Sequence, residues 1–473
     1  MKSSIWDRET IKNKILPTAP LPIFAIIAAL LLATIPRLFS TSYISAAIAA
    51  VLVMAVIVIL RQDQLAVTIV IAVHIYVDWY LGLYFVASVI APALLLIFWL
   101  ARSPRRPWVE PSALWLWLLF LIIAIFPVTR GLNIHDAEAY YITIIFSALI
   151  VFWLGLIVGR DAASLRRLLE VLAVFGILMA IHTIIEALTG IVLFKAAHPD
   201  TLLEQLSYFE ISGTSLHRAE AFLLNPDANG TFFAVMLFLP LGLFVHNSSF
   251  LKKTFYLTGV FIILLALLFT YSTGAWLAAL AGGLCFILFV GRSRYRVLIP
   301  VVLLIAALSI VVLFPSQVAT QFAHFGASYE WPLRIGGWLT ALNVIQAFPL
   351  TGLGMGSSVY IVRADPYRVP EQFIPLEHPH NSYLEFATQG GLPLLVVFLA
   401  ILALALWQAG RNWALTDTRT RSLLSGGWAA VLALSFNSLV SPGWTFAPLA
   451  PVGWLILGAI SSPLLAKNLS NPS

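Results

Sequence analysis

The densest group of proton-transferring side chains in this sequence lies immediately before a long apolar run. It contains two glutamates, two histidines and an asparagine: Glu377, His378, His380, Asn381 and Glu385. A histidine with a pKa of about 6.5 can remove a proton at neutral pH, and a neighbouring carboxylate can orient its ring. His380 paired with Glu377 would therefore suit the activation of a hydroxyl group, and we assign these two residues to catalysis. We assign His378, Asn381 and Glu385 to substrate binding. The spacing predicts acid–base chemistry close to a membrane surface.

The same stretch fits two other interpretations. Pro379 starts or precedes a helix that Asn381 or Ser382 can cap, and Asn381 and Glu385 would then share one helix face. In that case the polar residues only close a loop onto a helix. Zinc is another alternative, because His-Pro-His offers two ligands. No HExxH motif or cysteine pair completes a tetrahedral set, so the sequence favours a site without a metal.

Arg334 is a candidate catalytic residue at the start of an amphipathic segment. Apolar residues at helical spacing predict a helix that begins near residue 331 and that Pro349 ends: Ile335, Trp338, Leu339, Leu342 and Ile345. Such a helix is expected to lie in the membrane interface with its aromatic face down. An arginine at its N-terminus would suit an anion at the membrane surface, although it would equally suit contact with lipid headgroups.

A glycine-rich turn follows this helix in "GLGMG", residues 352–356. We assign Gly352 and Gly354 to substrate binding, because glycine lets the backbone pass close to a neighbouring group. No strand and helix of a nucleotide-binding fold surround the motif, so it is weak as a phosphate motif.

Arg218 is the second cationic candidate and a predicted substrate-binding residue. It lies in "HRAEAFLLNPDANGTFF", residues 217–233, directly before an apolar run. The Asn-Pro-Asp-Ala-Asn part is typical of a turn whose side chains bond to their own backbone. A purely structural role for these asparagines is as well supported as a ligand role.

The elements that must position these residues are membrane helices. The chain has 473 residues, of which 60% are hydrophobic and 10% charged, and its mean hydropathy is +0.95. Soluble domains carry about 25% charged residues, so this composition excludes a soluble protein. The net charge of +6 reflects basic loops between apolar runs, which disfavours nucleic acid as a partner. The single cysteine, Cys285, excludes an intrachain disulfide.

We predict an all-α polytopic membrane protein with about fourteen transmembrane helices and a large helical outer loop. The predicted spans are 21–35, 43–60, 65–79, 83–100, 113–128, 140–158, 168–189, 231–245, 254–270, 274–290, 297–314, 391–407, 423–440 and 446–465. With both termini in the cytoplasm, 20 of the 27 Lys and Arg residues lie on the inner side, as the positive-inside rule expects.

This topology leaves two long outer loops, which we expect to hold the site. It divides the chain into a cytoplasmic tail 1–20, membrane bundle 21–189, outer loop 190–230, membrane bundle 231–314, outer catalytic loop 315–390, membrane bundle 391–465 and cytoplasmic tail 466–473.

Three stretches now point to a family: "RAEAFLLNPDANG", "RIGGWLTALNVIQAFPLTGLGMGSSVY" and "HPHNSYLEFATQGGLPLL". Together they resemble the O-antigen ligase and O-antigen polymerase family of bacterial membrane glycosyltransferases, over roughly residues 210–410. The resemblance implies an enzyme of the GT-C type. It would move a glycan from a polyprenyl-diphosphate carrier to an acceptor hydroxyl on the outer face of the bacterial inner membrane, with no cofactor or metal.

The resemblance also implies partners and residue roles. The partners are the lipid-linked donor, a glycan or lipid acceptor, membrane lipid and, for a polymerase, a chain-length regulator. His380 matches the family's essential outer-loop histidine, and Arg334 matches the arginine thought to neutralise the diphosphate. The family often has Ser-Arg-Gly where this chain has Thr273 between Ser272 and Gly274. Arg218 is the candidate for that missing charge.

A lipid-linked oligosaccharide flippase or other proton-coupled transporter is the main alternative. Two pairs of ionisable residues lie four apart within predicted spans, namely His74 with Asp78 and His182 with Glu186. Each pair would share a helix face and suit proton transfer across the membrane. A multispan peptidoglycan polymerase is a third interpretation with the same chemistry, and its histidine motif fits less well.

Overall fold

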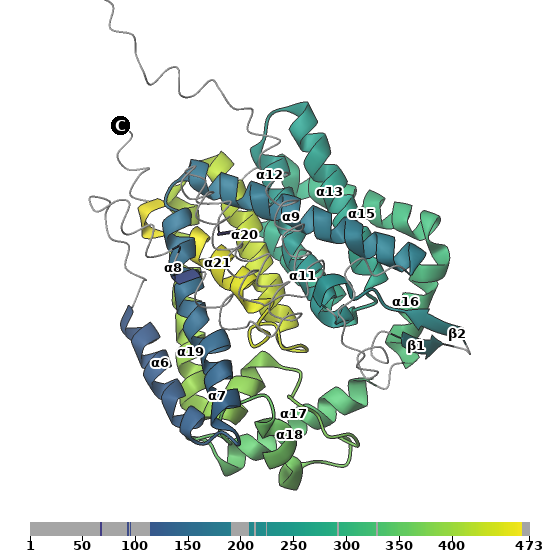
Figure 1. Cartoon of the computed structure of the whole chain (residues 1–473). Coiled ribbons are helices and arrows are strands. Elements are labelled where there is room, and N and C mark those ends of the chain that lie inside the picture. Colours follow the sequence, from purple (N-terminus) through teal and green to yellow (C-terminus); the bar gives the residue numbers. More distant parts are fainter. Residues whose placement is uncertain are drawn as a thin grey trace, which may run out of the picture.

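The computed structural model describes residues 114–190, 208–211, 214–223, 225–290, 293–327 and 330–465, with isolated residues at 67, 68, 92, 93 and 95. This part of the chain is a helical bundle with a two-stranded antiparallel hairpin at one side, β1 (Tyr208–Ile211) and β2 (Thr214–His217), as Figure 1 shows. The fold is therefore helical, as predicted, except for this hairpin in the first of the two predicted outer loops.

The first half of the described chain contains α6 (Leu114–Thr129), α7 (Ile134–Tyr140), the π-helix η2 (Tyr141–Phe146), α8 (Ser147–Val158), α9 (Ala162–Thr189), the 3-10 helix η3 (Ala221–Leu223), α11 (Pro226–Met236), α12 (Phe238–His246), α13 (Phe250–Phe269) and α14 (Thr273–Phe289). The second half contains α15 (Ser293–Leu313), α16 (Pro315–Ala327), α17 (Glu330–Ala347), α18 (Val359–Arg363), the 3-10 helix η4 (Asp365–Tyr367), α19 (Ser382–Leu415), α20 (Thr418–Asn437) and α21 (Ala450–Ile460).

Six helical stretches in the described residues are long and apolar enough to cross a membrane: Ile134–Val158, Ala162–Thr189, Pro226–His246, Phe250–Phe269, Arg294–Leu313 and Ser382–Leu415. Each predicted span from 113–128 onward coincides with a helix or with consecutive helices. The four earlier spans, and with them His74 and Asp78, lie outside the described residues. The total of about fourteen and the cytoplasmic termini stay predictions.

Buried aromatic side chains hold the helices around α19 together. Trp117 lies 5.2 Å from both Phe152 and Trp454, measured between ring centroids, and Trp444 lies 4.7 Å from Trp454. Such pairs add about 0.5–1.5 kcal/mol each beyond the area they bury. These rings come from α6, α8, α21 and the connection before α21, and Phe398 of α19 lies 6.1 Å from Trp444 and 6.0 Å from Trp454, so they pack these helices around α19.

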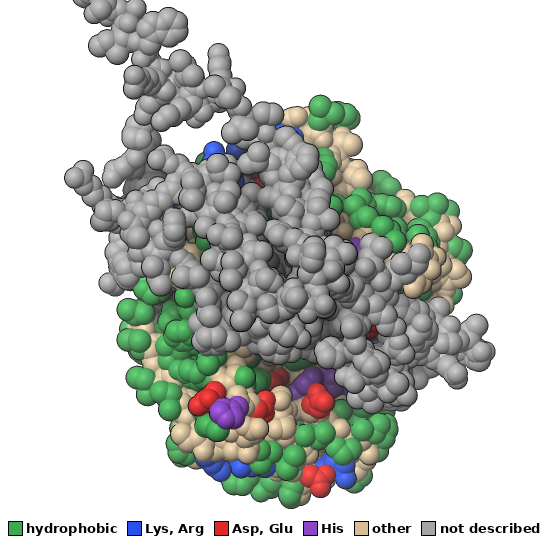
Figure 2. Space-filling model, in the orientation of Figure 1, with side chains coloured by type: hydrophobic (Ala, Val, Ile, Leu, Met, Phe, Trp, Pro, Cys, Tyr) green, Lys and Arg blue, Asp and Glu red, His purple; other side chains and the backbone are tan. Residues whose placement is uncertain are grey.

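The segment between α16 and α19 forms a cap with a small hydrophobic core of its own. The buried residues of this core are Ala341, Val344, Leu353, Val359, Tyr360, Ala364 and Leu376. In Figure 1 this cap, with α17 and α18, lies at the end of the bundle where α7 and the start of α19 meet. Figure 2 shows acidic and histidine side chains gathered at this end, whereas hydrophobic side chains cover the flanks.

The predicted helix after residue 331 is confirmed as α17, which ends at Ala347, just before Pro349. Its contact with the protein differs from a simple amphipathic pattern. Small residues form the buried face, including Gly336, Gly337 and Ala341. The predicted apolar face stays exposed on the cap surface, with Leu339 at 41% and Leu342 at 46%. Small residues let α17 approach the rest of the cap closely, and its larger apolar side chains point away from the cap.

Candidate functional site

The structure brings the two predicted arginines together on one carboxylate. Arg218 donates from Nη2 to Asp227 Oδ1 at 2.6 Å, and Arg334 donates from Nη2 to Asp227 Oδ2 at 2.8 Å. Charged groups at these distances form strong hydrogen bonds. Arg218 and Arg334 come from the two segments predicted as outer loops, which the sequence separates, and the fold brings these segments together on Asp227.

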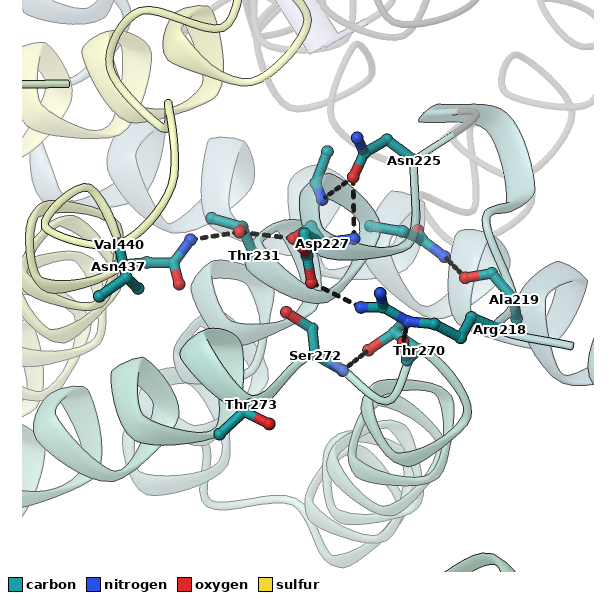
Figure 3. A network of polar contacts seen from close by, with 12 residues as sticks. Arg218, Ala219, Asn225, Asp227, Thr231, Thr270, Ser272, Thr273, Asn437 and Val440 are labelled. Carbon is teal, nitrogen blue, oxygen red and sulfur yellow. Dashed lines mark hydrogen bonds and ion pairs between the residues drawn. The ribbon is translucent and has the colours of Figure 1, made fainter. Parts of the chain in front are cut away.

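Arg218 is buried beside the turn between α13 and α14. Its side chain is 5% exposed, and its Nε donates to the carbonyl oxygen of Thr270 at 3.1 Å. Figure 3 shows the guanidinium between Asp227 and this turn, with Ser272 and Thr273 nearby. The Ser272 side chain also contributes a hydrogen bond to Asp227. Arg218 therefore places positive charge beside the turn that precedes Thr273.

Arg334 fastens the cap to the bundle. It lies in the first turn of α17, and its side chain is 12% exposed. Besides its bond to Asp227, it donates from Nη1 to the carbonyl oxygen of Val440 at 2.6 Å. Val440 follows α20, so one guanidinium joins the cap to two separate parts of the bundle. A planar fork of donors suits such a contact, whereas a lysine has a single charged atom.

Asp227 is positioned by the start of α11. Asn225 caps this helix, since its Oδ1 accepts from the backbone N–H groups of Asp227 at 2.9 Å and Ala228 at 3.0 Å. The prediction of a turn bonded to its own backbone is therefore confirmed for Asn225. The bridge that Asp227 makes between the two arginines was not predicted, because an aspartate in the Asn-Pro-Asp-Ala-Asn run is already explained by a turn bonded to its own backbone.

Strained backbone surrounds this cluster. In the described residues, the non-glycine positions with positive φ are Ala221 at 44°, Tyr271 at 51° and His380 at 49°. Tyr271 follows the carbonyl that Arg218 contacts, and Ala221 lies three residues after Arg218. A non-glycine residue in this region costs of order 1–3 kcal/mol, and such residues cluster at functional sites. Their positions therefore support a functional site here.

The two histidines form a contacting pair with defined protonation. Their ring centroids lie 4.4 Å apart, and the backbone N–H of His380 donates to His378 Nδ1 at 3.1 Å. Because Nδ1 of His378 accepts this bond, the ring proton of neutral His378 lies on Nε2.

Burial, followed by the charge of Arg334, lowers the pKa of His378 to about 4. The pKa of His380 is lowered well below its usual range, by burial first and then by His378 and Arg334, while Asp227 acts in the opposite direction. Both imidazoles are therefore neutral at neutral pH. The influence of Arg334 and Asp227 also places His380 in the electrostatic neighbourhood of the arginine cluster.

The expected pairing of His380 with Glu377 is not formed. Glu377 is exposed, and no hydrogen bond or ion pair joins it to His380 in the described part of the chain. The left-handed backbone at His380 turns its N–H back to His378 instead. The carboxylate that acts on His380 is Asp227, which is distant in sequence.

Asn381 and Glu385 share one face, as predicted, and that face is occupied by the protein itself. Asn381 caps α19 and donates from Nδ2 to the carbonyl oxygen of Leu439 at 2.9 Å. Glu385 is buried and accepts from the hydroxyls of Tyr140 at 2.8 Å and Thr445 at 2.6 Å. These contacts favour a structural role over the substrate-binding role expected for both residues.

The glycine turn approaches the chain's own backbone. Gly352 and Gly354 have φ of 61° and 114°, and a Cβ on Gly354 would overlap the carbonyl oxygen of Arg130. The N–H of Leu353 donates to Thr388 O at 2.7 Å, and the N–H of Gly354 donates to Gln389 O at 3.1 Å. The predicted tight turn is thus confirmed. Its N–H groups bond the protein, so substrate binding through them gains no support.

Helix α19 is interrupted where this turn contacts it. Gly391 has non-helical angles, with φ of 74° and ψ of 177°. The N–H of Leu392 donates to Pro349 O at 2.7 Å, in addition to the two bonds from the turn to Thr388 and Gln389. The cap and the broken helix therefore satisfy each other's backbone groups.

No group of three or more His, Cys, Asp or Glu side chains suited to a metal ion occurs among the residues that the structure describes. The charged groups assembled at this end of the bundle are two guanidiniums and one carboxylate, next to two neutral imidazoles.

Comparison with known proteins supports the family suggested by the sequence. The family model described as O-antigen ligase matches residues 258–399, a range that contains Arg334, His378 and His380 and excludes Arg218 and Asp227. No curated protein matches the chain. The family and the apolar helices indicate an integral membrane protein that acts in glycan transfer during O-antigen assembly. The match over residues 258–399 confirms the resemblance to the O-antigen ligase and polymerase family.

Proposed function

We propose that this protein transfers a glycan from a polyprenyl-diphosphate carrier to an acceptor hydroxyl, at the outer face of the bacterial inner membrane. The observation that carries the proposal is the meeting of Arg218 and Arg334 on Asp227, next to neutral His380. These residues match the groups that such a transfer requires: fixed positive charge for a leaving phosphate and a base for the acceptor.

The arginines act on the leaving group. As the bond between C1 of the sugar and the diphosphate oxygen breaks, negative charge grows on the diphosphate. Guanidiniums already held in place stabilise that charge without reorganisation, which is the largest single contribution in many enzymes. A guanidinium has five N–H groups, so an arginine bonded to a carboxylate and a carbonyl can also contact a phosphate.

His380 acts on the acceptor. Its lowered pKa keeps the imidazole neutral, so it can accept the hydroxyl proton as the new C1–O bond forms. We propose a single displacement with inversion at C1, in which the diphosphate lipid leaves with the electrons of the broken bond. Asp227 opposes the lowering of the His380 pKa, which favours the imidazolium produced by this step.

The test uses purified protein in liposomes with a lipid-linked glycan on the donor side and a panel of acceptors. The expected result is a new glycosidic bond, formed by the parent and lost in both Arg334→Ala and His380→Ala. A lipid A core acceptor identifies a ligase, and a second lipid-linked glycan identifies a polymerase. Bond formation at the parental rate by the two folded variants would overturn the proposal. Movement of the lipid-linked glycan across the bilayer without a new bond would indicate the flippase.

A further inference from the structure

Glu186 is a buried carboxylate that the proposed chemistry does not use. It lies near the end of α9 and is fully buried. A buried carboxylate is costly unless hydrogen bonds compensate for lost water. Its two oxygens accept from consecutive backbone groups, the N–H of Glu220 at 3.0 Å and the N–H of Ala221 at 2.8 Å. Glu186 therefore holds the backbone two and three residues after Arg218 by two hydrogen bonds.

Ala219, which lies between Arg218 and the residues bonded to Glu186, is held by two further hydrogen bonds. The N–H of Ala219 donates to Phe269 O at 3.0 Å. The carbonyl of Ala219 accepts from Asn229 Nδ2 at 3.3 Å, and the same Nδ2 lies 3.2 Å from Thr183 Oγ1. Figure 3 shows this carbonyl contact beside Arg218. Thr183 precedes Glu186 by about one turn of α9, so one face of that helix supports the whole segment.

Ala221, one of the two residues bonded to Glu186, has a strained backbone. Ala221 has a φ of 44°, which a non-glycine residue adopts only when its surroundings enforce it. In this conformation its N–H donates to Glu186 Oε2, and we expect this bond to help hold the positive φ. Without this bond, Ala221 would relax toward ordinary backbone angles, and the direction of the chain at Arg218 would change.

We propose that Glu186 is a positioning residue that aims the Arg218 guanidinium at the site. This inference rests on the proposed function, because it assigns Glu186 a part in binding the lipid-linked donor through Arg218. It replaces the proton-transfer role considered for His182 and Glu186, since both oxygens of Glu186 hold backbone N–H groups.

Substitution of Glu186 tests this role. Glu186→Gln keeps the shape but places an NH2 group against a backbone N–H. Misplacement by about 1 Å can cost about 100-fold in rate, so we expect kcat/KM for the lipid-linked donor to fall by about 10-fold to 100-fold. The KM for the acceptor and the pH profile are expected to stay as in the parent, because the imidazole pair is untouched.

A milder variant guards against a folding defect. Thr183→Val removes the hydroxyl beside Asn229 and is expected to lower kcat/KM for the donor by about 3-fold, since it loosens one supporting contact. Thr143→Val is the matched control. Thr143 also donates to a carbonyl four residues earlier in a helix and is 8% exposed, but it contacts neither Arg218 nor its segment.

The decisive experiment is a double-mutant cycle between Glu186→Gln and Arg218→Ala in the full-length protein, read as kcat/KM for the donor alongside thermal unfolding. If Glu186 acts through Arg218, the double variant loses no more than Arg218→Ala alone, within about 2-fold. Additive losses, or an acid limb of the pH profile displaced by Glu186→Gln, would overturn the positioning role. If Arg218→Ala itself has no effect, the proposed donor site fails. If Arg218→Ala impairs transfer and Glu186→Gln does not, only this inference fails.

Discussion

The arginine cluster and the histidine pair lie at the same end of the bundle and are held in different ways. Arg218 and Arg334 each contact a carboxylate and a backbone carbonyl, and their segments are fastened to several helices. The hydrogen bond recorded for the histidines in the described residues is the one from the His380 backbone to His378. Charge that stabilises a leaving group is most effective when fixed. A base must exchange a proton, and that task requires a neutral ring with fewer permanent partners.

The largest expected effect comes from a substitution in the arginine cluster. Arg334→Ala removes one guanidinium and releases both Asp227 and Val440, so transfer should fall by about 100-fold to 1,000-fold. Arg334→Lys should recover little, because one ammonium cannot reproduce the fork that spans these two partners. Single-turnover transfer from a lipid-linked donor measures both variants. Arg368→Ala is the matched control, since among the described residues the ion pair of Arg368 is with nearby Asp365, at 3.4 Å in the same cap. Equal losses in Arg334→Ala and Arg368→Ala would refute the special role of the cluster.

Substitutions in the histidine pair should distinguish His380, the proposed base, from its neighbour His378. His380→Ala should lower the transfer rate by about 100-fold or more, whereas His378→Ala should lower it by about 10-fold. Because His380 has a positive φ, His380→Gly should unfold at a higher temperature than His380→Ala while remaining as inactive. Transfer assays and thermal unfolding in detergent give the two readings. An equally active His380→Ala protein would remove His380 from the chemistry.

The pH profile sharpens the comparison. Burial lowers the pKa of His378 to about 4, and the pKa of His380 is also well below normal. Folding therefore favours the neutral rings, so their contribution to stability is complete above the unfolded pKa of about 6.5 and is lost as pH falls toward 4. We expect kcat/KM to stay level from about pH 8 to 5.5. In His378→Ala the acid limb should move to higher pH, because His378 helps to lower the pKa of His380. A midpoint near 6.5 in the parent would contradict this assignment.

The smallest expected effect comes from a substitution in the glycine turn, which supports the cap. Gly354→Ala combines a φ of 114° with overlap at Arg130, so it should lower the free energy of unfolding by about 1–3 kcal/mol. Gly283→Ala is the control, because a Cβ there meets nothing within 4 Å. It should be neutral or stabilising by up to about 1 kcal/mol. Thermal and denaturant unfolding in one detergent compare them, and equal stability of the two would show that the turn tolerates a side chain.

Features that depend on neighbouring residues could be predicted from the sequence. Hydropathy located the apolar helices that match the predicted spans from α6 onward, and Pro349 marked the end of α17. Asn381 was one of two predicted caps of α19, and the turn at Asn225 was predicted to bond to its own backbone. The tight turn at Gly352 and Gly354 was also predicted correctly. In each case the physical cause lies within a few residues of the feature, so the local pattern contains it.

Features that join distant segments could not be predicted in this way. Tyr140 bonds Glu385 across 245 positions, and Arg334 bonds Asp227 across 107. Glu377 was paired with His380 because the two lie three positions apart in sequence, but residue type gives no sign of the left-handed backbone that directs His380 elsewhere. The membership of the site depends on which helices pack together, and hydropathy does not determine that packing.

The contact between the glycine turn and the break in α19 constrains how the protein is made. Leu353 and Gly354 donate to carbonyls of Thr388 and Gln389, and Leu392 donates back to Pro349. The ribosome releases the turn before it releases these later partners. The cap must therefore wait for α19 to insert before its backbone is satisfied, and the two segments complete each other as one late step of synthesis.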